Sequence, residues 1–148
     1  MSVEFLPTFM RFVYEIVNAD RALAVDMELN MVGAVACGED DIEDYMTKSL
    51  RQALDSGEPV ATDNYSLTMN PADIPGTNQI LPALRYFVVI PLAGVGAVYV
   101  DLLIRKGIIH KDVVERLEAV AHSVVEKQAF AFTESDLSTE YKQLLAGT

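Results

Sequence analysis

The sequence predicts an α+β fold in which helices cover an antiparallel sheet. Two pairs of strand-like segments carry this prediction, within residues 21–37 and 85–104, because only three residues join the members of each pair. Helical patterns flank these pairs at both ends of the chain. Short connectors require antiparallel neighbours, so the pattern favours α+β over a doubly wound parallel sheet.

The first elements are a predicted helix over residues 6–18 and a hairpin formed by residues 21–27 and 31–37. In the helix, the apolar side chains recur at helical spacing and form one stripe. The two strands are mostly apolar, and Gly38 ends the second of them.

A second helix is predicted to begin at Asp40 or Asp41, whose carboxylates can accept the free N–H groups of a first turn. Its apolar residues also follow helical spacing. Gly57 suits the position just after the last turn, and Pro59 prevents continuation.

The middle of the chain is predicted to hold a short strand at residues 60–64 and then an aperiodic segment, 65–84, with a short helix near 78–84. A connection of this length inside one domain is unusual and is often functional.

A second hairpin is predicted from residues 85–92 and 96–104, both rich in β-branched and aromatic residues. Residues 87–90 are apolar without alternation, which predicts a central strand covered on both faces. We expect the helix before Gly57 and the long segment on one face of the sheet, and the terminal helices on the other.

Two apolar stripes follow, one in a helix from about Lys111 and one over residues 137–145, with a break expected at 133–136. A helix that runs past the core must bury its stripe. A second subunit would do so, giving a homodimer through the N- and C-terminal helices. The alternative is that residues 137–145 fold back on their own domain.

The composition excludes several classes of function. The chain has 11 basic and 22 acidic residues, a formal net charge of −11, which argues against binding nucleic acid or an anionic membrane. One cysteine excludes a disulfide framework and a multi-cysteine metal site. No signal peptide or membrane span is recognisable, so a cytoplasmic single domain is expected.

Five short segments resemble, in order and spacing, motifs of the GAF domain family over about residues 3–126. They are Ala19-Asp20-Arg21-Ala22, Gly38 with Asp41-Ile42, Ser56-Gly57-Glu58-Pro59-Val60 with Asp63-Asn64, Leu84-Arg85 with Val88-Val89-Ile90-Pro91-Leu92, and Gly96-Ala97-Val98-Tyr99-Val100-Asp101. The resemblance implies one GAF-like domain over residues 1–148, with 127–148 as a C-terminal helical extension.

The resemblance also implies a five- or six-stranded sheet of core order 2-1-5-4-3 and a dimerising face formed by the first and last helices. A ligand pocket is implied on the opposite face, roofed by residues 65–84. The function expected is that of a non-catalytic sensory or regulatory domain in signal transduction, which binds a small molecule and acts on an output protein in trans. Members of this family bind many different ligands, so neither the ligand nor a cofactor is identified.

The polar and aromatic residues nearest the implied pocket are the candidate ligand-binding residues. Alternation along the strand puts Ala97, Tyr99 and Asp101 on one face. Arg85 is the one cation in this candidate set and would anchor an anionic ligand; the structural alternative is an ion pair with one of the many carboxylates. The candidates are Asp63, Asn64, Tyr65, Arg85, Phe87, Tyr99 and Asp101.

Cys37 raises an enzymatic alternative, because free-methionine-(R)-sulfoxide reductases are single GAF domains of similar length. Those enzymes use more than one cysteine, since a sulfenic acid must be resolved by a second thiol. With Cys37 alone, a buried structural thiol is the simpler interpretation. The histidines, His110 and His122, are expected at the surface, and no metal site is expected.

Overall fold

The computed structural model describes residues 2–38, 42–61, 85–103 and 109–146. The predicted strand end at 62–64, the short helix near 78–84, and Asp40 and Asp41 therefore lie outside the described residues. The elements, in chain order, are η1 (Ser2–Phe5), α1 (Leu6–Val17), β1 (Arg21–Asp26), β2 (Met31–Val35), α2 (Asp44–Ser56), β3 (Val60–Ala61), β4 (Arg85–Leu92), β5 (Gly96–Leu103), α5 (Lys111–Lys127) and α6 (Glu134–Ala146).

The strands form one five-stranded sheet in the order β2-β1-β5-β4-β3, and every neighbouring pair is antiparallel. This order confirms the predicted 2-1-5-4-3 arrangement. The two long hairpin strands lie near the middle, where β5 pairs with β1 on one side and with β4 on the other. The prediction that residues 87–90 belong to a central, fully covered strand is confirmed, because all four are buried.

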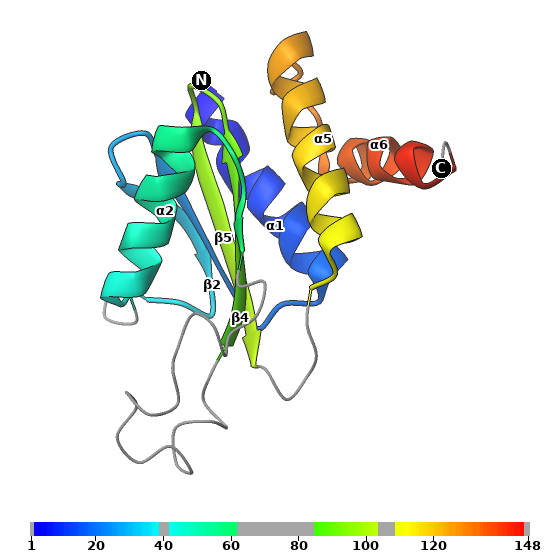
Figure 1. Ribbon diagram of the computed structural model, residues 1–148. Helices are drawn as coiled ribbons and strands as arrows, with labels where there is room; N and C mark the ends of the chain where they lie inside the picture. Colours follow the sequence, from blue (N-terminus) through cyan, green and yellow to red (C-terminus); the bar gives the residue numbers. More distant parts are fainter. Residues whose placement is uncertain (1, 39–41, 62–84, 104–108, 147–148) are drawn as a thin grey trace.

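Helices cover both faces of the sheet (Figure 1). α2 lies on one face, over an apolar cluster that includes Leu23, Met46 and Phe87. α1 and α5 lie on the other face, over a larger cluster. The expected division between the middle helix and the terminal helices is therefore confirmed. Among the described residues, no helix combines the length and the apolar character needed to cross a membrane.

Two element ends differ from the prediction for local reasons. β2 stops at Val35, because Ala36 has a φ of 54° and leaves the extended conformation. α2 begins at Asp44 with Glu43 as its N-cap, and Met46 Sδ accepts a hydrogen bond from the Glu43 N–H at 3.4 Å. The predicted start at Asp40 or Asp41 is therefore wrong by a few residues.

The C-terminal helices are separated earlier than predicted. α5 ends at Lys127, because Gln128 is left-handed, with a φ of 53°. Residues 133–136, expected to form the break, instead begin α6: Thr133 Oγ1 accepts from the Asp136 N–H, and Asp136 Oδ2 accepts from the Thr133 N–H. This reciprocal capping satisfies N–H groups that a first turn otherwise leaves unpaired.

The apolar stripe of α6 packs within its own subunit. Leu137 is fully buried and Tyr141 is nearly so, and the Tyr141 ring meets Phe12 of α1 edge-on at 6.2 Å between ring centres. In Figure 1, α6 lies beside α5, and it also packs against α1. Of the two alternatives for this stripe, the structure shows the fold-back for the residues it describes.

Candidate functional site

The α2 face of the sheet carries a row of side chains in direct cross-strand register. Asp101 of β5 lies opposite Arg21 of β1 on one side and Phe87 of β4 on the other. Side chains alternate along each strand, so Tyr99 and Arg85 also belong to this face. The candidates Arg85, Phe87, Tyr99 and Asp101 are therefore together on this face, and the alternation predicted along the strand is confirmed for Tyr99 and Asp101.

Asp101 is the centre of this group. Its side chain has no exposed surface, and it accepts hydrogen bonds from three side chains. Arg21 donates from Nη2 to Oδ2 at 2.6 Å and from Nε to both oxygens at 3.1 Å. Arg85 Nη1 donates to Oδ1 at 3.2 Å, and the Tyr99 hydroxyl donates to Oδ2 at 2.6 Å. The structural alternative for Arg85, an ion pair with a carboxylate, is thus observed.

Backbone contacts at the start of β1 hold Arg21 in position. The Asp20 N–H donates to the Asp101 carbonyl at 2.7 Å, and the Leu103 N–H donates to Asp20 Oδ2 at 2.7 Å. These two bonds fasten the turn after α1 to the end of β5. Because Arg21 is the next residue after Asp20, its guanidinium lies opposite Asp101.

The environment of the group changes the proton affinity of two side chains. Burial alone would lower the pKa of Arg21, but the hydrogen bonds and negative charge of Asp101 outweigh it and raise that pKa above its usual range. Burial raises the pKa of Tyr99 above its usual range, and the adjacent Asp101 carboxylate raises it further. Arg21 therefore stays charged and Tyr99 stays neutral at physiological pH.

Aromatic rings extend the group toward α2. The Phe87 and Tyr99 rings are stacked, with centres 5.8 Å apart and planes 19° apart. The Tyr45 ring of α2 lies 5.8 Å from Phe87, and its hydroxyl oxygen is 3.4 Å from that of Tyr99. Arg21 also reaches α2, because its Nη2 lies 3.9 Å from Met46 Sδ.

The sequence interpretation missed two members of this group. Arg21 belongs only to the first GAF-like motif in that interpretation, although it shares the two-residue period of Leu23 and Val25 and so faces α2. Tyr45 is not among the candidates, because the sequence places it only in the predicted second helix. Both lie in the described residues beside the candidates, whereas Asp63, Asn64 and Tyr65 lie outside them.

Other potential sites in the described chain differ from this group. Cys37 is a buried thiol, 6% exposed, in the apolar cluster under α2. His110 occupies the N-cap position of α5 without a side-chain capping bond and is exposed, and His122 is exposed with its Nε2 3.9 Å from Glu118 Oε2. Within the described ranges, no cluster of histidine, cysteine and carboxylate side chains could hold a metal ion.

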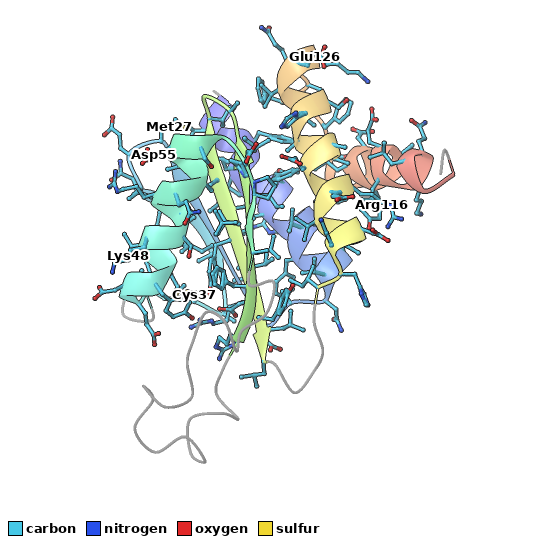
Figure 2. The ribbon with its side chains drawn as sticks, viewed as in Figure 1. Met27, Cys37, Lys48, Asp55, Arg116 and Glu126 are labelled. Atoms are coloured by element: carbon cyan, nitrogen blue, oxygen red, sulfur yellow. The ribbon has the colours of Figure 1, made fainter. Side chains whose placement is uncertain are left out.

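The surface of the described residues also includes two open depressions. One lies on the outer side of α2, where Figure 2 shows Lys48 and Asp55 projecting away from the sheet. The other is formed between α5 and α6 and includes Arg116, also labelled in Figure 2. Neither contains a residue of the Asp101 group.

Comparison of the whole chain with models of known protein families found no match, and comparison with curated proteins also found none.

Proposed function

We propose that this chain is a GAF-type sensory or regulatory domain that binds a small molecule on the α2 face of its sheet. The proposal includes no catalytic step. The sheet order and the division of the helices between its faces agree with what the motif series implies. The observation that carries the proposal is the group of two guanidiniums, one carboxylate and three aromatic rings at one end of that face.

The energetics of the group favour a role in binding. A buried ion pair adds little net stability, because desolvation of the charges offsets their attraction, and apolar side chains of similar volume often serve as well. Asp101 nevertheless organises two arginines at a position where Arg85 keeps 26% of its side chain exposed. Part-exposed polar groups beside apolar rings are typical of small-molecule sites.

We propose that the signal passes from this face to the terminal helices. Arg85 begins β4, which carries Phe87 toward α2 and the buried side chains of Tyr86 and Val88 toward the opposite face. α5 packs against β4 on that opposite face. A ligand can bias the helices only if it binds one of their arrangements better than the other. The output would be a separate signalling protein in the cytoplasm.

We also propose a homodimer through the terminal helices. The apolar stripe of α6 no longer requires a second subunit, because α1 covers it within the same subunit. Sedimentation velocity across a range of protein concentrations tests the dimer directly. A constant monomer mass would contradict it and leave the ligand-binding proposal unaffected.

The buried position of Cys37 favours the non-catalytic proposal over a reductase. A reacting thiol needs access to its substrate, and Cys37 is packed among the apolar residues under α2. Turnover of free methionine sulfoxide by the wild type and by Cys37→Ala tests this. A wild-type rate that the substitution abolishes would replace the regulatory proposal with the enzymatic one.

The main test is a thermal-shift screen of purified protein against small molecules of mixed charge. We expect at least one binder, whose effect is lost in Phe87→Ala and retained in Arg51→Gln, a control on the exposed side of α2. A structure of the protein as purified should show any retained ligand against the Asp101 group. If no compound binds, the ligand-sensing proposal fails, and a ligand-free dimerisation module is the remaining alternative.

A further inference from the structure

The Asp101 group has an unbalanced charge. Arg21 and Arg85 are both paired to the same carboxylate, so the two guanidiniums and one carboxylate leave a formal charge of +1. This positive group lies in a chain whose formal net charge is −11. A local cation can hold an anion that the overall field of the protein repels.

The two arginines differ in their exposure and in the number of hydrogen bonds that they donate to Asp101. Arg21 has 13% of its side chain exposed and directs three hydrogen bonds to Asp101. Arg85 has 26% exposed and directs one, from Nη1. Within the described part of the chain, its Nε and Nη2 donors make no further side-chain hydrogen bond. Arg21 is therefore the structural partner of Asp101, and Arg85 has donors left for a ligand.

We infer that this site takes a small organic acid with a single carboxylate, an inference that rests on the proposed function. The planar donors of an arginine match a carboxylate in a two-pronged arrangement. One negative charge neutralises the group. A phosphate monoester is mostly doubly charged at neutral pH, because its second pKa is about 6. It would leave the group negative inside an already acidic protein.

The rings beside Arg85 indicate what the acid carries. Phe87 follows two residues later on the same face of β4, stacks on Tyr99 and lies near the half-buried Tyr45. Phe87 and Tyr99 are buried, at 8% and 0% exposure, so an aromatic or other apolar body attached to the carboxylate would pack on the half-buried Tyr45 ring. Benzoate is therefore a suitable probe, with benzamide as its neutral counterpart and phenyl phosphate as its phosphorylated counterpart.

The experiment titrates each probe at pH 7 and constant ionic strength, and follows the arginine Nε–H resonances and the thermal midpoint. The Arg85 resonance is assigned by its loss in Arg85→Lys. We expect benzoate to shift it saturably and to raise the midpoint, with benzamide and phenyl phosphate at least about tenfold weaker. Arg85→Gln should weaken benzoate about tenfold, while Arg51→Gln should not change it.

Several results would overturn the inference. These are no saturable shift with benzoate, equal binding of phenyl phosphate, or wild-type binding by an Arg85→Gln variant whose circular dichroism is unchanged. Arg85→Lys keeps the charge without the planar fork, so it should show intermediate affinity. If neutral or cationic compounds from the screen bind through Phe87 while benzoate does not, the carboxylate inference fails and the proposed function stands. If compounds of every charge fail to bind, both fail.

Discussion

Arg21 Nη2 and Asp101 Oδ2 lie 2.6 Å apart across the β1–β5 pair. The two residues are 80 positions apart in the chain and directly opposite in the sheet. Arg85 and Tyr99 complete the partners of the same carboxylate. A charge with no exposed surface is tolerated here because each side of it meets a donor.

Replacing the Asp101 carboxylate tests how much it contributes to the free energy of unfolding. In Asp101→Asn, both guanidiniums keep their positions but lose the negative charge that offsets their desolvation. We expect unfolding in urea to be easier by about 3–5 kcal/mol, the usual cost of breaking a buried pair. Asp55→Asn, the same change on the exposed side of α2, should stay within about 0.5 kcal/mol. Equal urea midpoints for the two variants would contradict the role given to Asp101.

Tyr99 should make the protein sensitive to alkali. Burial and the Asp101 charge raise its pKa in the folded state, so the unfolded chain, with a tyrosine pKa of about 10, releases this proton first. The contribution of Tyr99 is fully present below pH 10 and is lost above it by about 1.4 kcal/mol per pH unit. Urea unfolding of Tyr99→Phe at pH 8, 10 and 11 should show a shallower decline than the wild type. Parallel declines would contradict this coupling.

Gly96 should not tolerate a side chain. A Cβ there would overlap the carbonyl oxygen of Val25 and come within 2.9 Å of Leu6 Cδ1. The first obstacle is backbone in the centre of the sheet and cannot move aside. We expect Gly96→Ala to lower the free energy of unfolding by about 1–3 kcal/mol. At Gly33 the same Cβ would find its nearest neighbours at 3.4 Å, so Gly33→Ala should cost less. The reverse order would contradict the close approach of the Val25 backbone to Gly96.

Leu137 tests whether α6 belongs to the core. Its side chain is fully buried in the cluster that includes Phe12 and Tyr141. Leu137→Ala would leave a cavity, and we expect a loss of about 2–5 kcal/mol in the free energy of unfolding. Met27→Ala, at a side chain that is 46% exposed and labelled in Figure 2, should change little. An unchanged midpoint for Leu137→Ala would show that α6 does not pack on α1 in solution.

Local patterns were sufficient to predict most of the framework. The three-residue connectors predicted both hairpins, and the helical stripes predicted α1, α2, α5 and α6. The two-residue period also predicted that Tyr99 and Asp101 share a face. These features depend on neighbours in sequence, whose geometry is fixed by the backbone itself.

Relationships between distant elements could not be predicted in the same way. The pairing of Arg21 with Asp101 depends on which strand lies beside β5 and on the register between the two strands. The sequence pattern of β1 specifies neither its neighbouring strand nor that register. Tyr45 joins the group only because α2 crosses β4 and β5 with its first turn at that end. The stripe of α6 required cover, but its pattern does not distinguish a second subunit from α1.

The Arg21–Asp101 pair also specifies how the sheet assembles. If β1 slipped by one residue against β5, Arg21 would turn to the opposite face, toward the cluster that contains Phe9 and Leu117. Its guanidinium would then be buried among hydrocarbon groups, and Asp101 would lose its principal donor. The pair thus makes a sheet in the wrong register much less stable, while it adds little net stability to the sheet in the native register.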